Sequence, residues 1–380
     1  MPASRIRSID IFRGLTMLVM IFVNELAGVT GLPWWTYHMA PGKNGMTYVD
    51  VVFPLFLFIV GLSIPLAIAK RLELGDSMPL LWGHILVRSL GLVVIGIVLS
   101  NADGVDPGAT GMPPGVWPLI ALLGAILFWL NYPAGTWYRI LKYAALALLI
   151  VMLAVFRRKT PIGAAWLDFS YWEILGLIGR AYLAACILYV PFRKKLWAPA
   201  FWLVILTAWN IGTRLGMPTP ARLFPYWLWP FDSGELPSIV MAGIVASQII
   251  VRGKAIWALG YAAILFAAGA AFSFLGISKN AATPTWCLYC SGIGVVLFLI
   301  IYWLADVRGW HAWAAFVRPA GANTLLTYLL PDLYYFATLA IGFNPPWRTG
   351  WPGAVRCAIF TVCILGVSFL LTRKRIRLQL

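Results

Sequence analysis

Charged side chains are scarce in this sequence, and acidic ones are the scarcest. Of its 380 residues, 11% are charged, 13 are acidic and three are histidine, whereas 61% are hydrophobic. Water-soluble domains carry about 25% charged residues, so this composition excludes a soluble globular fold. The sequence also lacks a Walker loop, a Rossmann glycine pattern, an HExxH motif and a GxSxG motif, and therefore carries no signature of the common soluble enzymes.

The five cysteines provide no framework of disulfides or metal ligands. All of them lie in apolar segments, and Cys287 and Cys290 form a CxxC inside one such segment. Thiolates bind metals and carry out redox chemistry, and apolar surroundings disfavour them. We therefore interpret the cysteines as small buried packing residues and predict no metal site.

Long apolar runs are what the sequence has in abundance. Twelve of them approach the roughly 20 residues that cross a bilayer, and a helix satisfies its own backbone hydrogen bonds in hydrocarbon. We predict an all-α polytopic membrane protein, a single domain over residues 1–380 with about twelve transmembrane helices. The predicted spans are 9–29, 48–69, 81–100, 116–131, 139–156, 173–191, 197–213, 237–251, 256–276, 286–305, 319–340 and 352–371.

Basic residues are distributed unevenly between the two ends of these spans. Eighteen of the 29 lie on the side of the N-terminus, eight lie on the other side and three lie within spans. Because positively charged loops stay in the cytoplasm, both termini are predicted to be cytoplasmic. The cluster at 157–159 conflicts with this rule, so the topology around 116–172 stays open. The net charge of +16 comes from short clusters rather than a stripe, and we predict no nucleic-acid partner.

Polar residues at membrane depth are costly and are functional candidates by default. Asp10 and Arg13 begin the first span, while Asn24 and Glu25 stand near its other end, about 16 Å further along the helix axis. Asp10 and Arg13 are three residues apart and can pair on one helix face. They either anchor the helix end or contact a cofactor.

His38 lies in the outward loop after the first span, and Asp50 follows at the first turn of the second span. A loop histidine is most often a solvated side chain. A histidine that acts as a base needs a partner that fixes its tautomer. Because Asn24 and Asp50 flank it, His38 is the candidate catalytic residue.

The remaining polar candidates are spread along the chain. Arg88 and Arg180, which lie within spans, either bind phosphate or pair with carboxylates. Asp232, in an outward loop, either binds an amino sugar or caps the following helix. The other candidates in this group are Lys279, Asn280 and Asn323.

Several stretches of the sequence form a recognisable pattern. They are Arg5–Gly14, Phe22–Asn24, His38, Asn44–Gly45, Val49–Gly61, Leu175–Tyr182, Phe231–Asp232, Leu236–Ser238, Ser278–Asn280, Thr285–Trp286 and Gly321–Asn323. The N-terminal block is the most specific of them, and the pattern extends over most of the chain. Together these stretches resemble the heparan-α-glucosaminide N-acetyltransferase family of transmembrane acyltransferases.

The resemblance implies a transfer of acetyl from cytoplasmic acetyl-CoA to the amine of a glucosamine on the opposite side, by a homodimer. His38 then matches the catalytic histidine, supported by Asn24 and Asp50. We assign the acceptor to Glu25, Asp232, Lys279 and Asn280, and acetyl-CoA to Arg13, Arg88, Arg180 and Asn323.

The sequence also departs from the family pattern. We expect no counterpart of the lumenal N-terminal domain of the animal enzyme, and we therefore expect a bacterial cytoplasmic membrane. The sequence inserts a helix pair near 116–156 and has longer spacings around His38, so the acceptor can differ from heparan sulfate. Two alternatives stay open, an amino-sugar transporter and an O-acyltransferase acting on an envelope polysaccharide.

Overall fold

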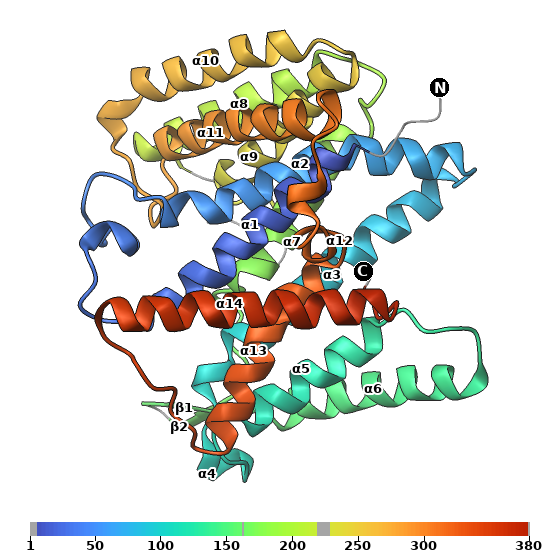
Figure 1. Ribbon diagram of the computed structural model, residues 1–380, viewed down its shortest axis with the longest axis vertical. Helices are drawn as coiled ribbons and strands as arrows, with labels where there is room; N and C mark the ends of the chain where they lie inside the picture. Colours follow the sequence, from blue (N-terminus) through green and yellow to red (C-terminus); the bar gives the residue numbers. More distant parts are fainter. Residues whose placement is uncertain (1–5, 162, 219–228, 379–380) are drawn as a thin grey trace.

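The computed structural model describes residues 6–161, 163–218 and 229–378 and is almost entirely helical (Figure 1). Arg5, which opens the N-terminal motif, lies outside these residues. The described residues contain twelve helices of seven residues or more. They are α1 (Arg7–Leu26), α2 (Val49–Glu73), α3 (Met78–Ser100), α5 (Val116–Trp129), α6 (Thr136–Val155), α7 (Glu173–Tyr189), α8 (Ala198–Arg214), α9 (Glu235–Val251), α10 (Ala255–Ala271), α11 (Pro284–Tyr302), α13 (Thr324–Ala340) and α14 (Gly350–Arg373).

Shorter elements lie between these helices. They include α4 (Pro107–Thr110), α12 (Arg318–Ala322), the 3-10 turns η1 (Trp34–Thr36), η2 (Ala102–Gly104) and η4 (Ser273–Leu275), and a π-helical turn after α11 (Trp303–Val307). Strands β1 (Arg158–Thr160) and β2 (Gly163–Ala165) form an antiparallel hairpin in which Arg158 lies opposite Ala165. This hairpin contains two residues of the basic cluster at 157–159, and Arg158 pairs with Asp168 at 2.6 Å.

Each predicted span coincides with a helix, but the span 319–340 is wrong as a single element. The chain leaves the helical conformation at Asn323, which separates α12 from α13. The Asn323 side chain donates to the Ile376 carbonyl and accepts from the Leu378 amide. Asparagine favours such side chain–backbone bonds over a continued helix, and here they hold the C-terminal segment.

Five helical segments are long and apolar enough to cross a membrane: Val49–Glu73, Met78–Gly104, Thr136–Val155, Pro284–Val307 and Gly350–Arg373. Large apolar side chains also point away from the protein, as Ile256, Ile264 and Val362 do with 72%, 67% and 66% of their surface exposed. Such exposure is unfavourable in water, which indicates an integral membrane protein. The full set of about twelve crossings stays a prediction.

Most helix axes run from left to right in Figure 1, which indicates the direction of the membrane normal. The end of α14 and the α2–α3 and α5–α6 connections lie on the right, while the α1–α2, α10–α11 and α13–α14 connections lie on the left. The start of α1 and the end of α14 therefore lie on one side, as an even number of crossings requires. That this side is cytoplasmic stays a prediction.

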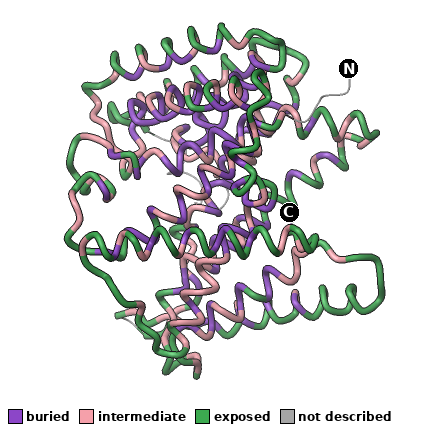
Figure 2. Tube along the Cα trace, in the orientation of Figure 1, coloured by how far each residue is buried: buried purple, intermediate pink, exposed green. Residues whose placement is uncertain are grey.

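The centre of the bundle is built on α9, which is buried along most of its length (Figure 2). It packs closely on α2 because Gly61 and Gly243 face each other there. A Cβ atom added to Gly61 would lie 1.9 Å from the Val240 carbonyl oxygen. By contrast, α6 packs on α5 at the edge of the molecule and is exposed along its outer side.

The interpretation of the cysteines needs one correction. All five are free thiols, and four are buried, but Cys363 is exposed on α14. Because α14 is an apolar helix at the surface of the bundle, an apolar position on it need not face the protein interior.

Candidate active site

The loop between α1 and α2 is shaped by its own hydrogen bonds. The Tyr37 hydroxyl donates to the Val29 carbonyl at 2.7 Å and accepts from the Leu32 amide at 3.1 Å. The Thr47 hydroxyl donates to the Tyr37 carbonyl at 2.7 Å. These bonds fold the loop back on itself, so that His38 lies next to the start of α2.

Asp50, at the second position of α2, is the centre of this arrangement. Its side chain is 1% exposed. One oxygen accepts from the amides of Met39 and Thr47 at 3.0 and 2.9 Å, and from the Thr47 hydroxyl at 3.3 Å. The other oxygen lies 2.7 Å from Nδ1 of His38. A helix N-terminus further favours a carboxylate there, so this aspartate is held in one orientation.

The Asp50 carboxylate dictates the hydrogen-bonding state of His38. A carboxylate accepts only, so Nδ1 carries the proton that is donated to it and Nε2 keeps a free lone pair. The His38 side chain is 43% exposed, which leaves Nε2 accessible. Oriented in this way, the imidazole can take up a proton from a bound group, and the carboxylate stabilises the imidazolium that forms.

Lys279 is brought to this pair from a distant part of the sequence. Its Nζ lies 3.2 Å from Nε2 of His38. The segment before α11 is attached to the α1–α2 loop, because Asn44 Oδ1 accepts from the Ile277 amide and the Gly45 amide donates to the Ile277 carbonyl. Burial lowers the pKa of Lys279, although Asp50 acts in the opposite direction. The neutral amine is therefore accessible at a lower pH than in an ordinary lysine.

Two supporting residues of this site were not among the predicted ones. Thr47 provides two of the bonds to Asp50, and Trp286 Nε1 donates to the Asp50 main-chain carbonyl at 3.2 Å, which joins α11 to α2. A threonine three residues before a helix-initial aspartate was a usable local signal. The contact of Trp286 spans 236 positions, and no local pattern reveals it.

The other residues predicted for the catalytic and acceptor sites lie in different surroundings. Asn24, which was predicted to support His38, is exposed near the end of α1, and its side chain forms no hydrogen bond with a described residue. Asn280 is exposed beside Lys279. The Glu25 side chain is 2% exposed and pairs with Arg356 of α14 at 2.8 Å, which commits it to an interior ion pair.

Asp232 and Arg180 pair with each other at 2.5 Å, so an outward loop residue meets a residue two turns into α7. Burial raises the pKa of Asp232 to about 6, against the lowering effect of Arg180. Arg180 also donates to the Trp229 carbonyl at 2.6 Å. Arg180 was predicted either to bind phosphate or to pair with a carboxylate, and in the structure it pairs with the Asp232 carboxylate.

Of the four residues predicted to bind the donor, Arg13 and Asn323 lie together, whereas Arg180, described above, and Arg88 lie elsewhere. Arg13 donates to Ser63 and to the Gly321 carbonyl and lies 3.8 Å from Asp10, while Asn323 lies at the end of the same α12 turn. Arg88 is exposed on α3 and lies over the Tyr182 ring.

A cavity of about 330 Å³ at the α1 and α12 ends is lined by Asp10, Arg318 and Arg377. Arg318 and Arg377 belong to the eighteen basic residues on the side of the N-terminus and were not among the predicted site residues. Their positive charge was visible in the sequence, but their convergence on one cavity was not.

The chain is similar to two curated animal enzymes over part of its length. Heparan-alpha-glucosaminide N-acetyltransferase of Mus musculus is 41% identical over 101 residues, which are 27% of this chain and 15% of that protein. The Homo sapiens protein of the same name is 42% identical over 99 residues, 26% of this chain and 14% of that protein. The matched stretch is thus far shorter than the similarity over most of the chain that the motifs suggest.

A family profile covers a larger part of the sequence. It is described as a domain of unknown function, DUF5009, and it matches residues 5–200, just over half of the 380 residues. The matched region contains the α1–α2 loop with His38 and Asp50. The chain therefore belongs to the DUF5009 family.

Proposed function

We propose that this protein is a membrane acetyltransferase that moves acetyl from cytoplasmic acetyl-CoA to an amine on the opposite face of the bilayer. The observation that carries the proposal is the His38–Asp50 hydrogen bond of 2.7 Å, with Nε2 of the imidazole left accessible. The partial similarity to two N-acetyltransferases supports the same chemistry. The proposed location is a bacterial cytoplasmic membrane, with the acceptor in the periplasm.

In the proposed reaction, the amine nitrogen of the acceptor attacks the thioester carbonyl carbon. A C–N bond forms and the C–S bond breaks. Nε2 of His38 takes the proton that the attacking nitrogen loses, and Asp50 stabilises the resulting imidazolium. The imidazolium then returns this proton to the departing sulfur, so that coenzyme A leaves as its thiol and His38 is neutral again. In its protonated form Lys279, 3.2 Å from Nε2, stabilises the negative charge that develops on the carbonyl oxygen.

The donor is proposed to enter from the side where α1 begins and α14 ends. Acetyl-CoA carries several phosphate charges and does not cross hydrocarbon, so its nucleotide stays at the membrane surface. Arg318 and Arg377 line an open cavity there, next to the Asp10–Arg13 turn of α1. Guanidinium groups pair well with phosphate oxygens, and these two supply the positive charge for that part of the donor.

An apolar groove offers a route for the rest of the donor. It encloses about 620 Å³ between α1, α2 and α11. Phe12 and Ile301 line it toward one end, and Thr47, which donates to Asp50, lines it at the other. The pantetheine arm is slender and nearly neutral, so an apolar groove that reaches the support of the His38–Asp50 pair fits it.

The test compares two histidine variants in proteoliposomes supplied with acetyl-CoA and glucosamine, with N-acetylglucosamine measured by mass spectrometry. Because general base catalysis is worth about 10²–10⁴-fold, His38→Ala is expected to lose at least about a hundredfold in rate. His84→Ala is the control, since His84 lies at the other end of the bundle beside Asp76.

Two results would refute the proposal. One is a His38→Ala rate close to that of the wild type. The other is a wild-type protein that consumes no acetyl-CoA with any amine acceptor. Transfer to a polysaccharide hydroxyl alone would identify an O-acyltransferase, and uptake of the sugar without acetylation would identify a transporter.

A further inference from the structure

Arg88 is a cation at membrane depth that the proposed reaction does not use. It is exposed on α3, and it forms no hydrogen bond or ion pair with any described residue. Its guanidinium lies over the Tyr182 ring of α7, 5.2 Å from the ring centroid. The cavity proposed for the nucleotide of the donor is lined by other arginines, Arg318 and Arg377. The position of Arg88 therefore indicates a different ligand.

The depth of Arg88 follows from its place on α3. It is ten residues beyond Met78, the first residue of this helix, which is about 15 Å along the helix axis. The neighbouring Leu86, Val87 and Leu90 are 53%, 55% and 63% exposed, so this face of α3 contacts lipid. Because an arginine in hydrocarbon is costly unless an acceptor pairs with it, Arg88 needs a partner.

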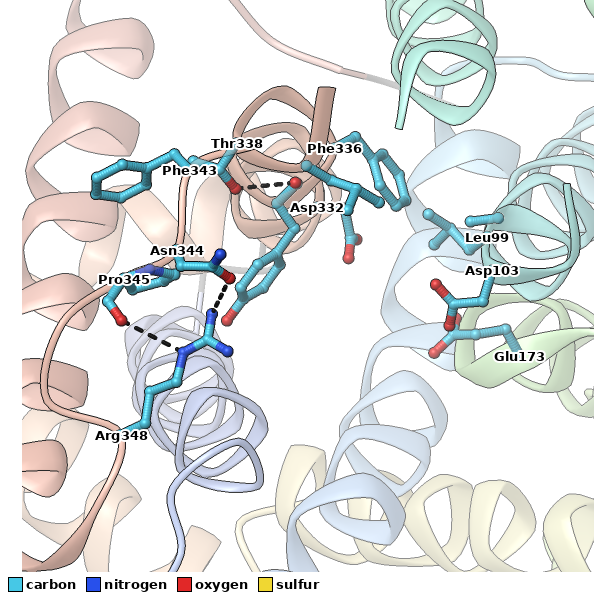
Figure 3. Close-up of a pocket in the computed structure, with 13 residues that line it drawn as sticks. Leu99, Asp103, Glu173, Asp332, Phe336, Thr338, Phe343, Asn344, Pro345 and Arg348 are labelled. Atoms are coloured by element: carbon cyan, nitrogen blue, oxygen red, sulfur yellow. Dashed lines mark hydrogen bonds between the residues drawn. The ribbon is translucent and has the colours of Figure 1, made fainter. Parts of the chain in front are cut away.

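Arg348, at the opposite face of the protein, has acceptors of its own. Figure 3 shows it in the loop between α13 and α14, where it donates to Asn344 Oδ1 at 3.1 Å and to the Pro345 carbonyl at 3.3 Å. The cavity beside it is also lined by three carboxylates, those of Asp103, Glu173 and Asp332. A guanidinium presents several N–H donors, and within the described chain those of Arg88 meet no acceptor. Its acceptors therefore come from a ligand.

Close packing of α3 on α7 holds Arg88 and Tyr182 together. The Ser89 hydroxyl donates to the Gly179 carbonyl at 2.9 Å. A Cβ atom added to Gly179 would lie 2.9 Å from the Ser89 carbonyl oxygen, so the two backbones are in contact there. Ser89 is next to Arg88, and Gly179 is almost one turn before Tyr182. The stacked pair is therefore fixed at the outer edge of the α3–α7 contact.

Two further basic side chains extend this site toward the membrane surface. His84 is four residues before Arg88 and therefore lies on the same face of α3. Asp76 joins His84 to Arg71 of α2, because its carboxylate lies 3.2 Å from Arg71 and 3.9 Å from His84. We refer to Arg71, His84 and Arg88 as the basic patch. It contains three basic side chains and only one carboxylate beside them.

The direction of the Arg88 side chain brings its charge toward the polar layer of the membrane. Helical side chains lean toward the N-terminus of their helix. The N-terminus of α3 is at the α2–α3 connection, on the side where α14 ends (Figure 1). The long arginine stem can lie along apolar surface while its head reaches the interface. The guanidinium therefore lies toward the depth of the lipid phosphates.

An acidic lipid head group has the chemistry that the basic patch requires. Guanidinium groups pair with phosphate oxygens through two parallel hydrogen bonds, and basic pockets between transmembrane helices bind acidic head groups. The exposed Leu86 and Leu90 lie where the acyl chains of the same lipid would pack. A second copy of the chain fits less well, because a twofold interface brings the same patch from both subunits and would place cation against cation.

We propose that the basic patch binds the phosphate of an anionic phospholipid, in the leaflet on the side where α14 ends. Arg88 donates to the phosphate oxygens, while Arg71 and His84 add positive charge at the head group. The inference goes beyond the proposed acetyl transfer and is independent of it, because lipid binding here needs neither the donor nor His38.

Native mass spectrometry of the delipidated full-length protein tests the proposal. Phosphatidylglycerol is the probe, and phosphatidylcholine, whose head group is zwitterionic, is the comparator. The wild type should bind phosphatidylglycerol preferentially. Arg88→Gln should weaken this binding at least about tenfold, because hydrogen bonds to a charged group are lost. Arg139→Gln is the control. It removes the same charge from the first turn of α6, at the edge of the bundle, and should bind within about twofold of the wild type, since distant exposed charges are screened.

The proposal is overturned if the wild type binds both lipids equally, or if Arg88→Gln binds phosphatidylglycerol like the wild type. It is equally overturned if Arg139→Gln loses as much, because diffuse surface charge would then attract the lipid. Displacement of the lipid by acetyl-CoA would assign Arg88 to the donor site instead, and displacement by an equal concentration of inorganic phosphate would identify a soluble anion as the ligand.

The same spectra distinguish a lipid from a second copy of the chain. A dimer that Arg88→Gln converts to monomers would identify the second copy as the occupant and would refute the lipid site. Because Arg88 is exposed, its variant should fold, which monodispersity and thermal midpoint verify. If it does not fold, Arg71→Gln tests the same patch and should also weaken phosphatidylglycerol binding.

Discussion

Replacement of Asp50 by asparagine should change the tautomer of His38 while keeping most of the hydrogen bonds that hold the loop. The amide oxygen can still accept from the amides of Met39 and Thr47, which lie 3.0 and 2.9 Å from one carboxylate oxygen. The amide nitrogen then faces Nδ1 of His38, which is 2.7 Å from the other oxygen. An amide nitrogen donates, so Nδ1 must accept and the proton moves to Nε2. The imidazole is then in the tautomer that has no lone pair on Nε2.

The size of the effect follows from these contacts. A base in the wrong tautomer loses its catalytic contribution, about 10²–10⁴-fold, so the acetylation rate of Asp50→Asn should fall by at least about a hundredfold. Because hydrogen bonds to a charged group are worth about 1.5–3 kcal/mol and neutral ones about 0.5–1.5, the loss of stability should stay near 1–3 kcal/mol. The fold should therefore survive while the chemistry is lost.

The assay measures thiol release from acetyl-CoA in the presence of glucosamine, together with the thermal midpoint of each protein. Asp76→Asn removes the same charge just beyond the other end of α2, where Asp76 pairs with Arg71 at 3.2 Å, and should retain most of the activity. An Asp50→Asn rate within threefold of the wild type would refute the orienting role of Asp50. A loss of folded protein in this variant would show that the carboxylate charge is required for folding.

Two further predictions concern stability. Gly61→Ala should prevent folding, because its Cβ would lie 1.9 Å from the Val240 carbonyl oxygen. Gly83→Ala is the control and should be tolerated, because nothing surrounds the added Cβ there. Detergent-solubilised yield and thermal midpoint distinguish the two variants, and equal yields would contradict the α2–α9 contact. Asp232 has a pKa raised to about 6 from 3.8, so its stabilising contribution is complete below the unfolded value and is lost as the pH rises through about 6. The free energy of unfolding of the wild type should then fall by up to about 3 kcal/mol between pH 4 and pH 7 because of this group. In Asp232→Asn that part of the pH dependence should disappear. Identical profiles of stability against pH for the two proteins would contradict the raised pKa.

Sequence patterns predicted the helices because hydrophobic length is a local property. The predicted span 48–69 became α2, and the span 352–371 became α14, with boundaries shifted by only a few residues. The break at Asn323 escaped this reasoning, because hydrophobicity continues across it. What ends the helix there is a set of bonds from one side chain to the C-terminal segment, and these exist only once α14 has packed beside α12.

The same division holds for the candidate site. His38 and Asp50 are twelve residues apart, and the short loop between them allowed their pairing to be predicted. Lys279 is 241 positions from His38, so its proximity depends on the packing of α11 against α2. Glu25 was predicted to bind the acceptor. Its hydrogen bond with Arg356, which is 331 positions away, could not be predicted from the local sequence.

By itself, the sequence determined that this chain enters a membrane, where its helices run, and which histidine is a candidate base. Those properties follow from hydrophobic length and from residues close together along the chain. The tertiary structure alone decided that Lys279 joins His38, that Arg318 and Arg377 line one cavity, and that Asp103, Glu173 and Asp332 line another. Such convergence depends on which helices pack together, and that in turn depends on close contacts such as Gly61 against Gly243.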